Sequence, residues 1–240
     1  MQEKELDYIL VPLGLVFLGV YHTWLLLTVL FYPTKTVIGT NAQTTHRWAV
    51  NMMNDPAANG VLAVQTIRNS MMASTVLATA AISLSALISV YISSSSNVDS
   101  ISSELVYGNK TDIISSIKYF TILLCFLLAF LCNVQCIRYN AHVSFLITLH
   151  GSKSSSQSIE YVARNLNRGS FFWSLGLRAF YFSFPLFLWV FGPIPMFVCC
   201  CTLSVVLYFL DTTTSFTRDL HKLSVKDYTK VKDVESGGQT

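Results

Sequence analysis

Residues 171–210 read FFWSLGLRAFYFSFPLFLWVFGPIPMFVCCCTLSVVLYFL. This apolar run is too long for one crossing, because a membrane helix needs about 20 residues to cross about 30 Å of hydrocarbon. Near its middle, Gly192, Pro193 and Pro195 break a helix and suit a tight turn. The run therefore predicts a helical hairpin with arms at about 171–191 and 195–211. The alternative is one kinked and tilted span, since prolines are tolerated in membrane helices.

The rest of the chain supports a membrane protein. Apolar residues make up 52% of it and charged residues 12%, where about 25% charged is usual for soluble domains. Further apolar stretches at about 9–31, 70–92 and 117–137 are long enough to span a bilayer. We therefore predict an all-α fold, a multi-pass transmembrane helical bundle of five spans within one domain, residues 1–211.

The distribution of Lys and Arg chooses between four and five spans. With a hairpin, one side holds most of the basic residues and the other side keeps Lys4 and Lys110. Without it, the five basic residues between Arg218 and Lys232 move to the poor side and the asymmetry largely collapses. The positive-inside rule therefore favours five spans, with the N-terminus outside and a polar tail, 212–240, in the cytosol.

The cytosolic connection 32–69 has helical periodicity. Apolar positions on both sides of Asn54-Asp55-Pro56 predict two short amphipathic helices lying at the lipid headgroups. Gln65, Arg68 and Asn69 project on one side of the second helix. This polar patch suits lipid headgroups or the mouth of a pathway, and the alternative is interface anchoring with hydrogen bonds to helix ends.

Small residues recur every three or four positions in the span 70–92. They are Ser74, Ala78, Ala81, Ser85 and Ser89. Such residues let helix backbones approach closely in lipid. They predict a helix-packing face, which could also hold a homo-oligomer together.

His22 lies near the middle of the first span, where a titratable side chain is costly unless it faces protein or water. One interpretation is a proton-sensing or relay histidine. The other, which is favoured, is a neutral histidine bonded to Thr or Ser of a packed neighbour. No carboxylate is expected within any span, which argues against a proton pump.

Three further polar residues fall in or at the edges of spans. Arg178 lies about 10 Å inside the cytosolic end of its span by helical rise, within reach of snorkelling. A ligand-binding role would need it to face the bundle, toward Asn133 or Gln135 of the third span. Snorkelling or helix packing is the favoured interpretation.

Several longer stretches are together characteristic of one family. These stretches are LAVQTIRNSMMAST with the small-residue span after it, IKYFTILL with CNVQCIRY, and LRAFYFSFPLFLWVFGPIPMF. Together they resemble the plant multi-pass membrane family known as domain-of-unknown-function family 599. The resemblance covers about residues 7–211. It implies a membrane protein of plant type and supplies no activity, substrate or catalytic residues.

Searches for sites with specific chemistry give little. Asn109-Lys110-Thr111 is an acceptor pattern for N-glycosylation on the outer side, and its alternative is a plain polar turn. The six cysteines lie in or at the edges of spans and suit buried packing. No paired metal-ligand spacing, phosphate-binding loop or nucleophile motif is visible, so we expect no cofactor and no catalytic residues. The interrupted basic tail does not suggest nucleic-acid binding.

Two functional hypotheses follow. The first is a non-enzymatic scaffold or regulator in the endomembrane system or plasma membrane, with cytosolic protein partners at 32–69 and the tail. The second is a small channel or transporter of an ion or small solute, alone or as an oligomer. Scarcity of buried charge favours the first slightly.

Overall fold

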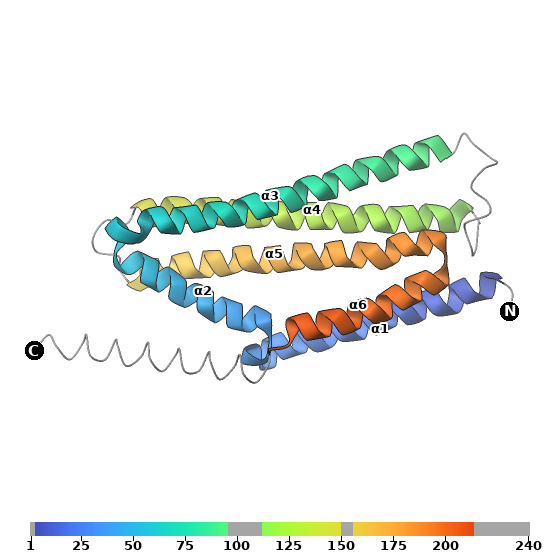
Figure 1. Cartoon of the computed structure of the whole chain (residues 1–240), viewed down its shortest axis with the longest axis horizontal. Coiled ribbons are helices and arrows are strands. Elements are labelled where there is room, and N and C mark those ends of the chain that lie inside the picture. The colour runs from blue at the N-terminus through green and yellow to red at the C-terminus, as the bar shows by residue number, and fades with distance from the viewer. Residues whose placement is uncertain (1–2, 96–111, 150–155, 214–240) are drawn as a thin grey trace, which may run out of the picture.

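Three long helices run side by side along the whole molecule. The computed structural model describes residues 3–95, 112–149 and 156–213. In Figure 1, α3 (Pro56–Ser95), α4 (Asp112–Leu149) and α5 (Ser156–Phe191) form a layer with α4 between the other two. Their 40, 38 and 36 residues give lengths of about 54–60 Å at 1.5 Å per residue. This is nearly twice the hydrocarbon thickness of about 30 Å, so only part of each helix can lie in a bilayer.

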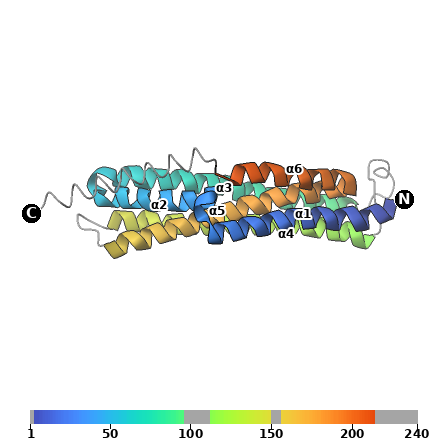
Figure 2. The ribbon, with the colours of Figure 1, turned by 90° about the horizontal axis from the view of Figure 1, so that it is seen from below.

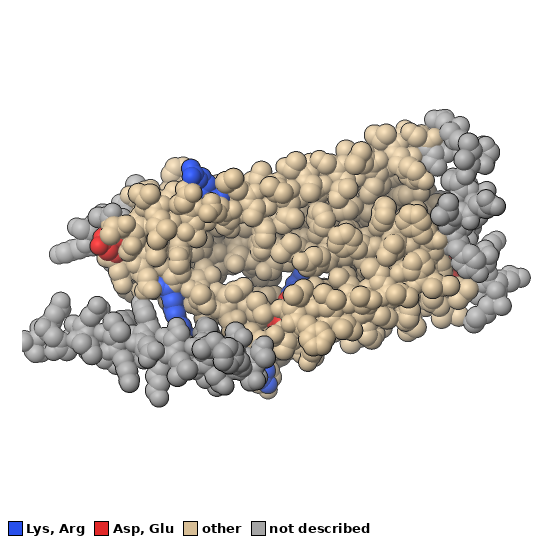
Figure 3. Space-filling view, viewed as in Figure 1, with Lys and Arg blue, Asp and Glu red and all other residues tan. Residues whose placement is uncertain are grey.

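Two shorter helices cover one half of this layer. α1 (Glu3–Phe31) and α6 (Pro193–Asp211) lie beside each other, with α6 against α5 (Figures 1 and 2). α6 has 19 residues and is about 28 Å long, close to the hydrocarbon thickness. We call α1, α6 and the parts of α3, α4 and α5 beside them the membrane half. In Figure 3 its visible surface is nearly free of charged side chains.

The predicted all-α, multi-pass fold is confirmed. In the part of the chain that the structure describes, five helices are long and apolar enough to cross a membrane, namely α1, α3, α4, α5 and α6. The core of the membrane half draws on all five. Its fully or nearly buried members are Val11, Ala81, Ile122, Phe126, Ala129, Ala179, Leu186, Met196 and Cys200.

The predicted break between the fourth and fifth spans is one residue long. α5 ends at Phe191 and α6 begins at Pro193, where the fixed proline φ suits a first helical position. Gly192 between them has φ 157° and ψ 167°, a conformation that is essentially limited to glycine. The chain therefore reverses direction here without a longer loop, and the second arm starts at 193 rather than 195.

The opposite half of the molecule has its own core. α2 (Val37–Asn54) follows a 3-10 turn, η1 (Pro33–Lys35), and packs mainly on α5 and on the start of α3. Eight buried residues join α2, α3, α4 and α5 into a four-helix cluster, which we call the α2 half. They are Ala49, Met53, Ala63, Ile67, Val143, Ile147, Val162 and Ala163.

The prediction of two short amphipathic helices is wrong for the second one. α2 is a separate helix, but residues 61–69 belong to α3, which continues unbroken into the span. Asp55 alone separates α2 from α3, because Pro56 suits the first position of a new helix. The apolar positions of 61–69 pack into the core of the α2 half, through Ala63 and Ile67.

The small residues of α3 pack within the chain. Ser74, Ala78 and Ala81 are 0–6% exposed, and the Ser74 hydroxyl donates to Cys136 Sγ of α4 at 3.2 Å. This face lets α3 and α4 approach closely, as small residues do in membrane helices. The part of the face at Ser74, Ala78 and Ala81 is therefore buried within the chain, whereas Ser89 at its end is exposed.

Candidate functional site

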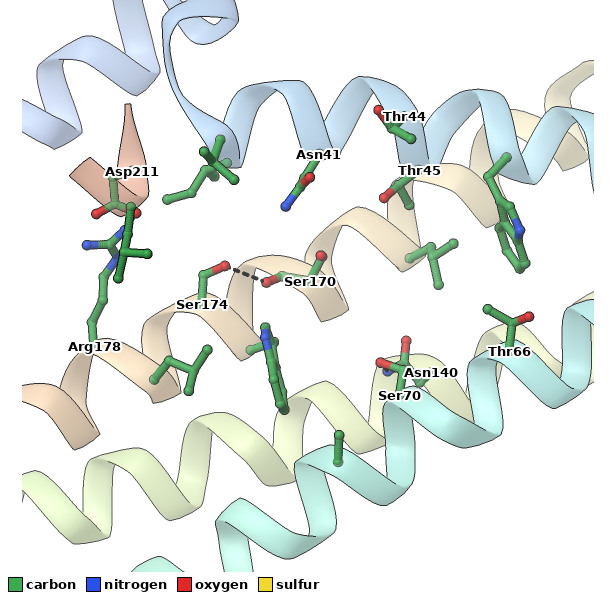
Figure 4. Close-up of a pocket in the computed structure, with 18 of the residues that line it drawn as sticks. Asn41, Thr44, Thr45, Thr66, Ser70, Asn140, Ser170, Ser174, Arg178 and Asp211 are labelled. Atoms are coloured by element: carbon green, nitrogen blue, oxygen red, sulfur yellow. Dashed lines mark hydrogen bonds and ion pairs between the residues drawn. The ribbon is translucent and has the colours of Figure 1, made fainter. Parts of the chain in front are cut away.

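A cavity lies where the membrane half meets the α2 half. Its volume is about 620 Å³ and it is partly open to the outside. α2 forms one wall, α5 the floor, and α3, α4 and the end of α6 complete it. Figure 3 shows the molecule hollowed in this region, and Figure 4 shows the side chains around it.

Hydroxyl and amide side chains dominate the polar part of the lining. α2 and α3 contribute Asn41, Thr44, Thr45, Thr66 and Ser70. α4 and α5 contribute Asn140, Ser170 and Ser174, and Figure 4 labels all eight. Two tryptophans, Trp48 and Trp173, and several aliphatic side chains form the remaining walls.

Helical spacing explains why these residues share one site. On α5, lining residues occur at 170, 173, 174, 177, 178 and 181, which is the three- and four-residue spacing of a single helix face. On α2 the lining residues follow the same spacing, at 37, 38, 41, 44, 45 and 48. α2 begins after an N-cap in which the Thr36 hydroxyl accepts from the Gly39 amide at 3.2 Å, and it packs along α5.

An ion pair closes one end of the cavity. Arg178 Nη2 of α5 donates to Asp211 Oδ1 of α6 at 2.8 Å, and the two side chains are 15% and 13% exposed. The Tyr21 hydroxyl of α1 donates to the other oxygen of the same carboxylate. The cluster therefore joins three helices of the membrane half at its inner end. The second guanidinium nitrogen, Nη1, is buried without a hydrogen-bond partner among the described residues.

This pair corrects two predictions. Of the favoured alternatives, Arg178 takes part in helix packing and does not snorkel, and its partner is Asp211 rather than Asn133 or Gln135. The expectation that no span holds a carboxylate is also wrong, because Asp211 is the last residue of a span-length helix. Buried pairs contribute little net stability but leave a costly isolated charge when one partner is lost.

His22 is bonded within its own helix. Its Nδ1 lies 2.8 Å from the Leu18 carbonyl oxygen, one turn earlier. Its ring makes an edge-to-face contact with Phe182 of α5, with 6.0 Å between the ring centroids. The predicted bond to a Thr or Ser of a neighbouring helix is therefore not the one that forms. His22 does not line the cavity.

Asn133 serves close packing between α4 and α5. It is fully buried, and its Nδ2 donates to the Ala129 carbonyl at 2.8 Å. A Cβ added at Gly176 of α5 would lie 2.8 Å from this nitrogen, so a larger residue there would force the Asn133 side chain to shift. Asn133 therefore lies beside Gly176, two residues from Arg178 at the inner end of the membrane half.

The remaining predicted polar residues lie on the surface or outside the described part. Arg68 donates to Gln65 at 2.5 Å and Arg138 donates to Gln135 at 3.4 Å, with both bonds exposed. Asn69 is also exposed. None of Gln65, Arg68, Asn69 and Gln135 lines the cavity. Asn109 lies outside the described residues.

A second buried polar cluster occupies the far end of the membrane half. Trp189 Nε1 of α5 donates to Asp7 Oδ1 of α1 at 3.2 Å. Lys118 of α4 places its ammonium 5.4 Å from the centroid of the Trp189 ring, and Asp7 and Lys118 are 5% and 4% exposed. Along α4, the core residues Ile122, Phe126 and Ala129 lie between Lys118 of this cluster and Asn140 of the cavity. Within residues 3–95, 112–149 and 156–213, no group of three or more His, Cys, Asp or Glu side chains could hold a metal ion.

Comparison with known proteins identifies a family. No curated protein and no solved structure matches the chain. The model of one protein family matches residues 9–216, which include every helix that lines the cavity and the whole membrane half except the start of α1. The chain therefore belongs to the family described as protein of unknown function, DUF599.

Proposed function

We propose that the chain is a non-enzymatic membrane regulator that binds a small ligand in the cavity between α2 and the long helices. The observation that carries the proposal is the partly open cavity of about 620 Å³, whose mostly apolar walls carry polar side chains from five helices. Ligand sites in proteins are commonly concave, of about 300–1,000 Å³, with apolar walls and a few placed polar groups. The cavity has each of these properties.

The regulatory part of the proposal is supported by α2, which is a helix of its own between α1 and α3. α2 is joined to α1 through the short turn η1 and to α3 through the single residue Asp55. Its side chain His46 reaches α5 through Glu160 at 2.9 Å, an exposed pair. A ligand held between α2 and α5 would favour the state in which α2 is docked, because it contacts both walls only in that state.

Native mass spectrometry after mild extraction tests the proposal. Ala73 lines the cavity on α3, and Ala73→Phe would fill part of it. Ala86→Phe is the matched control, since Ala86 is exposed on the same helix and does not line the cavity. A bound small molecule on the wild type and on Ala86→Phe that is absent from Ala73→Phe supports the proposal. The same mass on all three proteins overturns it.

Transport of a small solute is the second candidate. It is supported by the buried cluster of Arg178, Asp211 and Tyr21 at the end of the cavity, since buried charge in a span often marks a solute or ion path. Solute uptake by proteoliposomes that Arg178→Gln abolishes and Arg68→Gln leaves intact would favour it. Equal leak with and without the protein would argue against it.

Partners and location remain predictions. Cytosolic proteins are expected to contact the connection 32–69 or the tail, and a homo-oligomer would need a face other than the buried part of the small-residue face of α3. The expected location, the endomembrane system or the plasma membrane, and the plant type implied by the resemblance are tested by imaging a tagged chain in plant cells.

A further inference from the structure

We infer that the cavity binds an uncharged group with several hydroxyls, such as a sugar ring, either as the headgroup of a neutral glycolipid or free in solution. The inference rests on the proposed function, since it names the ligand class of the same cavity. It follows from the charge of the lining residues, from their hydrogen-bonding capacity and from the position of the cavity at the membrane edge.

The lining has no net charge to offer a ligand. Its two charged residues, Arg178 and Asp211, are bonded to each other at 2.8 Å, and Tyr21 donates to the same carboxylate. An anion would find a guanidinium that is already neutralised, and a cation would find a carboxylate whose two oxygens are both bonded. Moving an ion into such a site without a free partner is costly. The ligand is therefore neutral.

The lining is rich in hydrogen-bond acceptors. Thr44, Thr66 and Ser174 each donate their hydroxyl proton to a backbone carbonyl four residues earlier, at 3.0, 2.9 and 3.1 Å. The Ser174 bond is drawn in Figure 4. A hydroxyl that has given its proton to the backbone keeps lone pairs that can only accept. A ligand that satisfies several such oxygens must bring several donors, and neutral donors in number are characteristic of polyols.

The donors that the cavity offers suit the same group. The Asn41 side chain carries an amide, whose nitrogen can donate two hydrogen bonds. A ligand hydroxyl can accept from such a donor while donating to a threonine or serine oxygen. Alcohols combine both roles on one atom, so a ring with several of them matches the mixed lining.

The apolar walls explain how a sugar could be held at the membrane edge. The indoles of Trp48 and Trp173 offer apolar faces with a polar N–H, which suit the C–H face and the hydroxyl edge of a sugar ring. Leu207 and Leu210 of α6 also line the cavity, and Leu210 is exposed. An acyl chain attached to the ring could continue along this side of α6 into the bilayer.

Thermal unfolding of the full chain in phosphatidylcholine nanodiscs tests the inference. One set of nanodiscs contains monogalactosyl diacylglycerol, a second contains phosphatidylglycerol, and a third contains phosphatidylcholine alone with free methyl galactoside in the buffer. For the wild type we expect Tm to rise by a few degrees with the galactolipid or with the free galactoside, and not with phosphatidylglycerol, because a ligand that binds only the folded state raises Tm. A rise with the galactolipid alone identifies a headgroup, and a rise with the free galactoside identifies a soluble sugar.

Matched threonine variants locate the effect. Thr44→Val with Thr66→Val removes two lining acceptors and should abolish the rise in Tm. Thr75→Val with Thr202→Val is the control, because these exposed threonines make the same bond to the carbonyl four residues earlier, at 2.9 Å each, and do not line the cavity. A rise with phosphatidylglycerol only, no rise with either galactose compound, or equal loss in both double variants overturns the inference. If native mass spectrometry still finds a cavity ligand in those cases, the ligand class is wrong and the proposed binding function stands.

Discussion

At the scale of single residues, the buried charges define the site. Arg178 and Asp211 come from different helices, and each is mostly shielded from solvent at the boundary between the two halves. Tyr21 adds a third helix to the same carboxylate. These three side chains fix how α1, α5 and α6 meet next to the cavity. A substitution of any of them should therefore alter the packing at that end of the cavity.

Removing one member of the buried pair should be costly. Arg178→Met leaves the Asp211 carboxylate buried without its cation, and we expect a loss of about 3–5 kcal/mol in the free energy of unfolding. The double variant with Asp211→Leu removes both charges and should recover much of that loss. Unfolding in mixed micelles with increasing SDS measures both. Equal destabilisation of the single and double variants would show that charge burial is not the cause.

Gly176 provides a test of close packing. A Cβ there would lie 2.8 Å from Asn133 Nδ2 and 3.3 Å from Cys132 Cβ, so we expect Gly176→Ala to cost about 1–3 kcal/mol. Gly19→Ala is the control, because nothing lies within 4 Å of a Cβ at that position. The same unfolding assay compares them. A tolerated Gly176→Ala would mean that α4 and α5 can separate slightly without loss.

The sequence could indicate Arg178 as unusual but could not supply its partner. A charge inside an apolar run is visible from composition, whereas Asp211 is 33 residues away and is placed beside Arg178 only by the turn at Gly192. The lining hydroxyls were missed for a different reason. Ser170, Ser174 and Thr66 are common surface residues one at a time, and their shared face is meaningful only once α2 is known to lie over α5. The spacing of Ser170, Trp173, Ser174 and Arg178 on one helix was the available signal.

At the scale of elements, α2 is the distinctive part. The spans were predictable because about 20 consecutive apolar residues have few alternatives to crossing a membrane. The continuation of α3, α4 and α5 into the α2 half was not, because polar amphipathic sequence fits an interfacial helix as well as a bundle helix. What decides between them is the tertiary contact of residues such as Ala63 and Val143 in the second core.

The docking of α2 on α5 should depend on pH. The hydrogen bond from His46, and then the Arg164 guanidinium, lower the pKa of the Glu160 carboxyl below its ordinary value of 4.5. A carboxyl with a lowered pKa stabilises the docked state at pH above its ordinary value, and this contribution is lost as pH falls through the lowered pKa. Above pH 4.5 the α2 amides of the wild type should therefore exchange more slowly than those of Glu160→Gln, and this difference should disappear as the pH falls through the lowered pKa. An identical pH dependence in both proteins would exclude this pair as the cause.

At the scale of the whole molecule, the two halves differ in what they contact. The membrane half exposes large apolar side chains such as Phe17, Leu87 and Phe209. The α2 half carries the exposed charges of Arg68, Glu160 and Arg164. With five crossings, the start of α1 and the end of α6 lie on opposite sides of the membrane, and the α2 half lies on the same side as the end of α6.

Topology mapping in sealed, right-side-out vesicles tests this arrangement. A protease site inserted after Thr213 should be protected and an N-terminal tag should be cleaved, because the positive-inside rule places the α2 half in the cytosol. A detergent-permeabilised sample is the control for cleavage of both sites. Cleavage of both sites in intact vesicles would mean an even number of crossings and would remove the hairpin at Gly192.

Three unbroken helices shared by both halves also set the mechanics of the molecule. α3, α4 and α5 act as rigid rods from one end to the other, so bending either half against the other would break hydrogen bonds in all three at once. The joints of α2 are the short turn before it and the single residue after it, but its buried Ala49 and Met53 hold it against the long helices. The chain is therefore stiff along its length, and any movement of α2 at the wall of the cavity requires these two side chains to leave the core.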